Sequence, residues 1–218
     1  MTDAARLVAE QFGSPFLRSY ARSKLKIDPV YPAVLELLRG STAPLYDIGC
    51  GVGLLEFFLR ASGFPHAITG IDHDARKVAK ANELASRYSG LEFRSGDARD
   101  PVPSGTNVVL IDVLHYFSDA DQRLILASAA AAVPPRGIVI IRDAVRDNSL
   151  RYRITVAQEG FSRAVHWLRA ERLNFPTRDT ITSAFDGFEA EVVPMWGRTP
   201  FNNYLFVFRR SGAGTTKR

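Results

Sequence analysis

Three glycines in one short segment are the residues best suited to bind a ligand through the backbone. Gly49, Gly51 and Gly53 alternate with other residues, directly after an apolar run and directly before an amphipathic one. Glycine allows a sharp turn and a close approach that a Cβ atom would block. In open parallel sheets, ligands bind beyond the carboxyl ends of the strands. The segment therefore indicates either a ligand-binding loop or an ordinary strand-to-helix turn.

Three acidic residues accompany these glycines. Asp47 lies in the apolar run before them, Asp72 ends the next run, and Asp97 follows the third. A carboxylate at the end of a second strand can accept hydrogen bonds from both hydroxyls of a ribose. After a third strand, an acid could accept one from an adenine amino group. The spacing D-x-G-x-G-x-G does not fit the dinucleotide fingerprint G-x-G-x-x-G, which counts against a nicotinamide enzyme.

This combination resembles the class I S-adenosylmethionine methyltransferases, over roughly residues 44–145. The resemblance implies S-adenosyl-L-methionine as cofactor and a role for each of several residues. The methionine part would be surrounded by Asp47, Gly49, Gly51 and Gly53, the ribose held by Asp72 with His73, the adenine by Asp97 and Ala98, and the sulfonium flanked by Asp112 and Val113. The alternative for Asp47 and Asp112 is structural support of their loops. Cys50 is expected to be only a small residue in a tight turn.

The segment after the fourth apolar run bears on the methyl acceptor. It reads Asp112-Val-Leu-His-Tyr-Phe117 and contains no D/N-P-P-Y/F type of motif. Adenine-N6 and glutamine methyltransferases use such a motif to hold a planar amino group. The segment instead resembles the D-V-L-H segment of small-molecule methyltransferases. This resemblance disfavours nucleic-acid and glutamine amino groups and implies a small-molecule acceptor.

His115 is the candidate general base. The pKa of an imidazole lies near working pH, so the ring can take the proton of a phenol or a hydroxy acid. The alternative is that His115 packs against its loop or positions Tyr116. The Arg142-Asp143 pair follows the fifth apolar run, where Arg142 could bind an acceptor carboxylate or pair with Asp143.

Further segments complete the expected acceptor site. With His115-Tyr116 and Arg142-Asp143, the segments Tyr20-Ala-Arg-Ser-Lys-Leu-Lys and Trp196–Asn203 resemble a subgroup of small bacterial stand-alone methyltransferases associated with polyketide or aryl-polyene pathways. The residues expected to contact the acceptor are Tyr20, Tyr116, Arg142, His166, Trp196 and Asn203.

The pattern of apolar residues predicts the elements that position these side chains. Short apolar runs alternate with amphipathic ones, which favours right-handed crossovers and a mainly parallel sheet. The expected strands are 45–48, 67–71, 91–95, 107–111 and 137–141, followed by a long helical stretch over 149–172 and an antiparallel hairpin of 188–195 and 203–210. The predicted fold is thus α/β: a Rossmann-like, seven-stranded, mostly parallel sheet with helices on both faces.

The same pattern divides the chain into three parts. Residues 1–40 are expected to form a helical N-terminal lid or extension, residues 41–210 the methyltransferase domain, and residues 211–218 a flexible tail. The alternative for the first part is a set of helices packed on the domain with solvated charges.

Composition excludes several other classes. The chain has 218 residues and one cysteine, so neither an intramolecular disulfide nor a Cys-cluster zinc site is possible within it, and no metal is expected. No secretory signal is visible and no run approaches the roughly 18 apolar residues of a membrane helix, so a cytoplasmic protein is expected. The net charge of +5 comes from basic residues in 15–27, in 142–178 and in the tail. Such segments fit a solvated surface, an anionic small acceptor or nucleic acid.

The sequence as a whole predicts an enzyme that transfers the methyl group of S-adenosylmethionine to a small molecule with an aromatic hydroxyl or a carboxyl group. His115 is its candidate base. Two alternatives stay open: an RNA methyltransferase, favoured by the basic segments, and a domain that binds S-adenosylmethionine without catalysis. Oxygen, nitrogen and carbon all stay open as the methylated atom.

Overall fold

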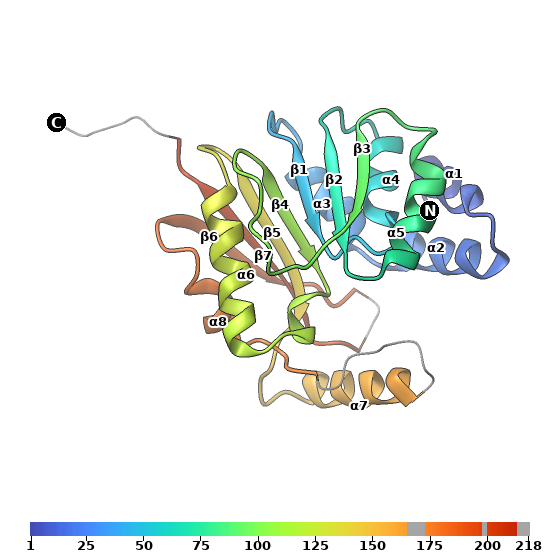
Figure 1. Ribbon diagram of the computed structural model, residues 1–218. Helices are drawn as coiled ribbons and strands as arrows, with labels where there is room; N and C mark the ends of the chain where they lie inside the picture. The colour runs from blue at the N-terminus through green and yellow to red at the C-terminus, as the bar shows by residue number, and fades with distance from the viewer. Residues whose placement is uncertain (165–172, 198–199, 213–218) are drawn as a thin grey trace. The chain divides into compact units, whose positions relative to one another are not determined.

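The computed structural model describes residues 1–164, 173–197 and 200–212 (Figure 1). Its strands are β1 (Leu45–Ile48), β2 (Ile68–Asp72), β3 (Leu91–Ser95), β4 (Asn107–Ile111), β5 (Ile138–Ala144), β6 (Phe188–Pro194) and β7 (Asn203–Arg210). They form a seven-stranded sheet with the order β3-β2-β1-β4-β5-β7-β6. The pairs β1–β2, β2–β3 and β4–β5 are parallel, whereas β7 is antiparallel to both β5 and β6. The predicted fold class is therefore confirmed.

The helices account for most of the remaining described chain. They are α1 (Asp3–Gln11), α2 (Pro15–Ile27), α3 (Val30–Leu37), α4 (Leu54–Ala61), α5 (Ala75–Ala85), α6 (Asp119–Ala132), α7 (Leu150–Ala164) and α8 (Arg178–Thr182), with a 3₁₀ turn, η1 (Leu114–Tyr116). The chain divides into two compact units, residues 1–100 and 101–218. The prediction that residues 1–40 act as a lid stays a prediction.

In the first unit, strands β1 to β3 lie side by side in a register that aligns their carboxyl ends. Leu45 pairs with Ile68 and Ile68 with Leu91, so the residues after each strand emerge at one edge. The core beneath this edge is aromatic. The Phe57 ring on α4 contacts the rings of Phe12, Tyr88 and Phe93, with centroids 5.3–6.3 Å apart. Burial of such large rings is a main source of folding free energy.

The N-terminal helices belong to the packing of this unit. Helix α1 buries Ala5, Val8 and Ala9. An ion pair between Arg22 and Glu10 joins α2 to α1. Two basic residues of the segment that begins at Tyr20, Arg22 and Lys24, therefore have partners within residues 1–40, since Lys24 pairs with Asp28.

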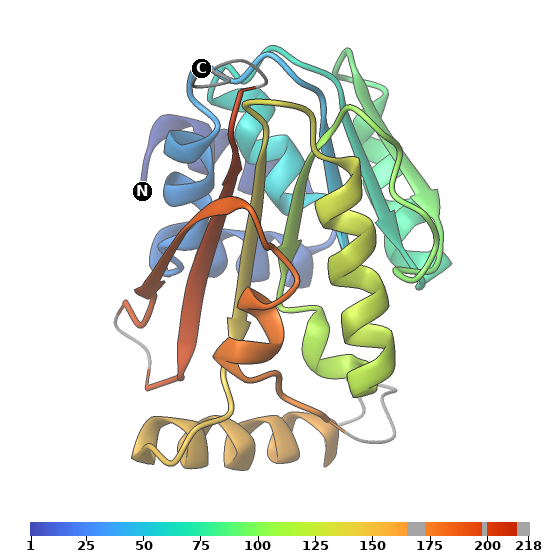
Figure 2. The same cartoon turned by 90° about the vertical axis from the view of Figure 1, so that its left-hand side faces the viewer.

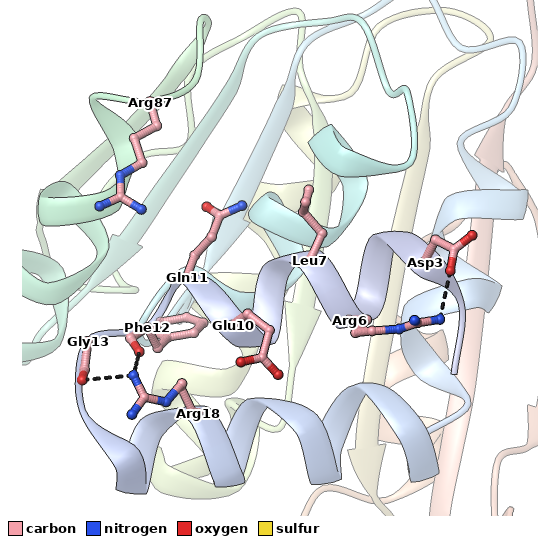
Figure 3. Close-up of a pocket in the computed structure, with 9 residues that line it drawn as sticks. All are labelled: Asp3, Arg6, Leu7, Glu10, Gln11, Phe12, Gly13, Arg18 and Arg87. Carbon is pink, nitrogen blue, oxygen red and sulfur yellow. Dashed lines mark hydrogen bonds and ion pairs between the residues drawn. The ribbon is translucent and has the colours of Figure 1, made fainter.

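An open pocket runs along α1 and the start of α2 (Figure 3). Its lining consists of Asp3, Arg6, Leu7, Glu10, Gln11, Phe12, Gly13, Arg18 and Arg87. Figure 3 shows the Arg18 guanidinium turned toward the end of α1, where it donates to the carbonyl oxygens of Phe12 at 3.1 Å and Gly13 at 3.2 Å. This contact fastens the two helices together. None of the residues predicted to bind cofactor or acceptor lines this pocket.

In the second unit, β4 and β5 are fully buried or nearly so, and β7 covers the other edge of β5. Helix α6 is capped at its N-terminus by Ser118, whose hydroxyl accepts a hydrogen bond from the backbone N–H of Asp121. Figures 1 and 2 both show α7 lying across the carboxyl end of β5. The predicted hairpin is confirmed as β6 and β7. The predicted helix over 149–172 is present as α7, and its last part, 165–172, lies outside the described residues.

Two general findings concern membranes and metal ions. None of the helices in the described part of the chain is both long enough and apolar enough to cross a membrane. Nowhere in residues 1–164, 173–197 and 200–212 do three or more His, Cys, Asp or Glu side chains gather in a way that could hold a metal ion.

Arg60 provides a test of the first unit. Its guanidinium donates to the carbonyl oxygens of Phe64 and His66 at 2.7 Å each and to that of Gly90 at 3.2 Å. Arg60→Ala should lower the free energy of unfolding by about 1–3 kcal/mol, because partly buried carbonyls lose their donor. Denaturant titration measures this value. Arg94→Ala, which breaks an exposed pair with Glu92, is the control and should change little. Equal losses in the two variants would contradict this interpretation.

Candidate functional site

The glycine segment forms a tight loop at the carboxyl end of β1. The backbone N–H groups of Gly49 and Cys50 both donate to the carbonyl oxygen of Ile71, at 2.8 and 2.9 Å. Gly49, Gly51 and Gly53 all have positive φ, of 85°, 59° and 79°. At Gly53 a Cβ atom would also lie 2.7 Å from the Phe93 ring. The expected sharp turn is therefore present. Its three glycines have no Cβ atoms, so the backbone of the loop is uncovered at these positions.

Asp72 ties this loop to the neighbouring strand. Its side chain is only 7% exposed. Oδ2 accepts a hydrogen bond from the backbone N–H of Gly51 at 2.9 Å, and Oδ1 accepts one from Asp74 at 2.8 Å. Each carboxylate oxygen can accept a further hydrogen bond, so Asp72 can still receive two hydroxyl groups. His73 is mostly exposed, with Nδ1 3.5 Å from Oδ1 of Asp72.

Asp97 has a partner that sequence reasoning missed. Its Oδ1 accepts hydrogen bonds from the backbone N–H and from Nε of Arg99, both at 2.9 Å, and its Oδ2 pairs with the same guanidinium. The hydrogen bonds from Arg99 lower the pKa of the Asp97 carboxyl to about 2. The spacing Asp-Ala-Arg was the available signal. Ala98 lies half-buried between the two.

A pair of buried carboxyl groups lies on the inner side of the loop. Asp47 on β1 is buried, and Glu56 on α4 is fully buried. The two side chains hydrogen-bond to each other. Burial raises the pKa of Asp47 to about 7 and that of Glu56 well above its usual range. The proximity of Asp47 raises the pKa of Glu56 further. Glu56 therefore stays protonated, and its carboxyl O–H donates the hydrogen bond to the Asp47 carboxylate.

Sequence reasoning missed Glu56, which lies within the apolar run LLEFFL. Its position depends on a glycine in the adjacent strand. A Cβ atom on Gly70 of β2 would lie 2.6 Å from Oε1 of Glu56 and 2.7 Å from Cβ of Cys50. Burial, followed by the proximity of the acids Glu56 and Asp47, raises the pKa of the Cys50 thiol. The thiol therefore stays protonated, in line with the expectation that Cys50 has no chemical role.

In the second unit, His115 stands in η1, directly after β4, and is buried. Its Nδ1 lies 2.7 Å from Oδ1 of Asp143, at the end of β5. The same carboxylate accepts the backbone N–H groups of Leu114 and Ala144, both at 2.8 Å. Because a carboxylate can only accept, Nδ1 carries the proton and Nε2 has the lone pair. Asp143 thus fixes both the tautomer and the orientation of the ring.

Aromatic rings surround this histidine. Phe175 stacks on His115 with ring centroids 5.4 Å apart, and Tyr116 lies at 4.1 Å. Tyr152 of α7 meets Phe175 edge-on at 5.6 Å. Tyr116 was predicted from the sequence, whereas Phe175 and Tyr152 were not. Their distance along the chain from His115 left no local signal.

The partner of Arg142 corrects one expectation. Pairing with Asp143 was one of the two roles considered for Arg142, but its Nη2 lies 2.9 Å from Oδ2 of Asp112. Successive side chains of a strand point to opposite faces, so Arg142 and Asp143 diverge. Asp112 has a positive φ of 58°, and its backbone N–H donates to the Arg142 carbonyl oxygen at 2.8 Å. Arg142 is itself buried, and Val113 beside Asp112 is buried as well.

The other predicted acceptor residues are more scattered. Trp196 meets Tyr204 edge-on at 6.1 Å, and the Arg151 guanidinium lies over its ring at 4.3 Å. Asn203 is buried at the start of β7, opposite Ala144. Tyr20 is partly exposed on α2 in the first unit. His166 lies outside the described residues.

Within each unit the structure thus brings together a separate set of predicted residues. The first unit joins Asp47, the glycine loop and Asp72 at the ends of β1 and β2. The second joins Asp112, His115, Tyr116 and Arg142 at the ends of β4 and β5. One set offers a backbone loop and hydroxyl acceptors, and the other offers an oriented base.

Comparison with known proteins gives the chemical context. A family model described as an O-methyltransferase domain matches residues 27–172. Indole glucosinolate O-methyltransferase 5 of Arabidopsis thaliana is 29% identical over 157 residues, which are 65% of this chain and 41% of that protein. Anthranilate N-methyltransferase of Ruta graveolens is 31% identical over 114 residues, 51% of this chain and 30% of that protein. The chain thus spans less than half the length of these relatives.

A solved structure supports the fold. Magnesium protoporphyrin IX methyltransferase from Synechocystis PCC 6803, crystallised with bound SAH, superposes with a TM-score of 0.66. It is 17% identical and covers 96% of this chain and 94% of its own. The narrower resemblance to bacterial enzymes of polyketide or aryl-polyene pathways stays a prediction.

The buried pair predicts an unusual dependence of stability on pH. A carboxyl whose pKa is raised by folding favours the folded state at low pH and costs stability as the pH rises. The cost is up to about 1.4 kcal/mol for each pH unit above the ordinary pKa of the group. Glu56→Gln removes this cost, because an amide can donate to Asp47 without titrating. Its melting temperature relative to the natural protein should therefore rise between about pH 5 and pH 8.

Thermal unfolding at several pH values measures this difference. Glu83→Gln is a matched control, since Glu83 is an exposed acid that pairs with Lys80 on the surface of α5. Its melting temperature should follow that of the natural protein at every pH. A pH-independent difference for Glu56→Gln would show that Glu56 is not held protonated.

Proposed function

Since the chain belongs to the O-methyltransferase family, we propose that it transfers the methyl group of S-adenosyl-L-methionine to a small-molecule acceptor. One observation carries the catalytic part of this proposal: the buried His115 ring is oriented by Asp143 through a 2.7 Å hydrogen bond. A domain that only bound the cofactor would have no use for an oriented base. The names of the two relatives, an O- and an N-methyltransferase of small molecules, support the same reaction class.

The first unit carries the residues that would hold the cofactor. The three positive-φ glycines leave room for the methionine part, and Asp72 keeps acceptor capacity for the two ribose hydroxyls. Asp97 and Ala98 would contact the adenine, with Arg99 holding the Asp97 carboxylate in place. When bound, S-adenosylmethionine supplies a methyl group on a positively charged sulfur, which is reactive without further activation.

The second unit carries the base. With Nδ1 donating to Asp143, Nε2 of His115 can take the proton of an acceptor hydroxyl as its oxygen becomes a nucleophile. The Asp143 carboxylate then stabilises the imidazolium that forms. A positioned base of this kind contributes roughly 10²–10⁴-fold to the rate. The remaining acceleration comes from alignment of the two reactants.

The surroundings of His115 favour an aromatic acceptor. The rings of Tyr116, Phe175 and Tyr152 offer faces and edges on which another ring can pack. Arg142 remains the candidate for an acceptor carboxylate, although its ion pair with Asp112 would have to be shared. An RNA acceptor has no comparable support, because the relatives named above act on small molecules.

Calorimetry with S-adenosylhomocysteine tests the cofactor assignment. Asp72→Ala should weaken binding about 10–100-fold, because two hydrogen bonds to a carboxylate are lost and the loop amide of Gly51 loses its acceptor. Glu83→Ala, an exposed acid on the following helix, should bind as the natural protein does. Equal affinities of the natural protein and Asp72→Ala, or no binding to either, would rule out the assignment.

Turnover tests the base. His115→Gln should lower kcat about 10²–10⁴-fold with a hydroxylated aromatic acceptor, while the affinity for S-adenosylhomocysteine stays the same. Asp143→Asn should also lower kcat, because an amide no longer fixes the tautomer of the ring. Release of S-adenosylhomocysteine over a panel of phenolic acceptors provides the measurement. His66→Gln, a histidine outside the site, is the control, and full activity of His115→Gln would exclude the role.

A further inference from the structure

Glu56 is an acid in a place where apolar residues would pack better. It is fully buried on α4, amid Leu55, Phe57 and other core residues. Neither of its oxygens meets an N–H or hydroxyl donor of the described residues. Its partner is the carboxyl of Asp47. A buried acid without a cation is costly, so its presence calls for a reason.

The groups around the pair make it an isolated acidic cluster. From β2, Asp72 acts on both carboxyls, and from the loop the Cys50 side chain lies, like Oε1 of Glu56, beside Gly70. Helices α1 and α3 meet α4 through other residues, since Phe12 contacts Phe57 and Tyr31 contacts Phe58. Among the described residues, no cationic side chain is one of the groups that shift the pKa values of Asp47 and Glu56. Two contacting carboxyls in such surroundings cannot both ionise, so at least one proton stays between them.

The positions of Asp47 and Glu56 along the chain connect the pair to the glycine loop. Asp47 lies one residue before Ile48 and two before Gly49, at the point where β1 becomes the glycine loop. Glu56 lies in the first turn of the helix that follows the same loop. The hydrogen bond between the two side chains therefore closes the loop at its base, from the strand before it to the helix after it. Gly70 provides the space that this closure needs.

We infer that Glu56 is a positioning residue for the cofactor, which keeps Asp47 ionised at the base of the glycine loop and makes S-adenosylmethionine affinity depend on pH through that carboxylate. This inference rests on the proposed function. The cofactor carries a sulfonium and an ammonium group against one carboxylate, so it is a net cation. A negative charge at the base of the loop attracts it, and protonation of Asp47 removes that charge.

The direction of the effect follows from this linkage. Bound cation favours the ionised form of Asp47, so the affinity should fall as the pH drops below the pKa of that group, about 7, and level off above it. Well below that pKa, the ionised fraction falls about tenfold for each pH unit. Without a hydrogen-bond donor from Glu56, Asp47 would hold its own proton more tightly. The profile of affinity against pH would then move to higher pH.

Calorimetry with S-adenosylmethionine between about pH 5.5 and 7.5 tests the inference. The ammonium group of the ligand begins to titrate only at the upper end of this range. Its titration is the same for every variant, so it does not affect the comparison between variants. The affinity of Glu56→Leu should still increase with pH at the upper end of the range, where that of the natural protein has levelled off. Near neutral pH this variant should bind about tenfold more weakly than the natural protein. Leucine fills the apolar site, so folding is favoured. Thermal unfolding checks each variant.

Two further variants separate positioning from packing. Glu56→Gln donates the same hydrogen bond from an amide, so it should rescue the profile that Glu56→Leu loses. Asp47→Asn removes the titrating charge, so its affinity should be low and nearly independent of pH. A role in packing alone would change the melting temperatures of these variants but would leave the midpoint of the affinity profile in place.

The outcomes distinguish this inference from the function on which it rests. Glu56→Leu with the pH profile of the natural protein would overturn the inference while leaving the proposed function intact. So would a natural protein whose affinity is the same across the range. Absence of binding by the natural protein at every pH would overturn the proposed function itself, and the inference with it.

Discussion

One interaction recurs at the carboxyl ends of the strands and holds both candidate sites. A carboxylate at the end of one strand accepts a backbone N–H from the turn that follows the neighbouring strand. Asp72 of β2 does this for Gly51 after β1, and Asp143 of β5 does it for Leu114 after β4. Parallel strands end at the same edge, so their following turns need a partner for exposed amides. The acids supply it and keep acceptor capacity to spare.

The recurrence explains why these turns can carry chemistry. A turn that is held only by its own backbone bonds would move with each ligand, whereas one anchored to the next strand is preorganised. Asp143 shows this most clearly, because its one side chain bonds both the backbone of η1 and the His115 ring. Asp72 likewise holds the glycine loop while it stays able to receive hydroxyls. In the proposed function, structural support and a role in binding or catalysis would therefore not compete for these residues.

Much of this architecture could be predicted from local patterns. The limits of β1, β3 and β4 were predicted correctly because apolar runs there end at glycine or proline or at a charged residue. Strand β5 continues past its predicted end to Ala144, because the buried Arg142 and Asp143 find partners in Asp112 and His115 and stay in the ladder with β7. Local polarity indicated a strand end there, and tertiary pairing overrode it.

The candidate site was less predictable, for related reasons. The glycine loop, Asp72 and His115 belong to recognisable local motifs. Glu56 is a single acid within an apolar run and is not part of any such motif. Its role depends on Gly70, which is distant in sequence and adjacent in space. The same holds for Phe175, which reaches His115 from beyond α7. Pairings across the chain are not visible in a single sequence.

The state of Cys50 has a consequence for an enzyme that handles an alkylating cofactor. Only a thiolate is a strong nucleophile, and burial, followed by the neighbouring acids, raises the pKa of the Cys50 thiol. A sulfur atom in the glycine loop can thus coexist with a reactive methyl group without being methylated. In the proposed function, burial of the thiol together with the acidic cluster would therefore protect the enzyme from modifying itself.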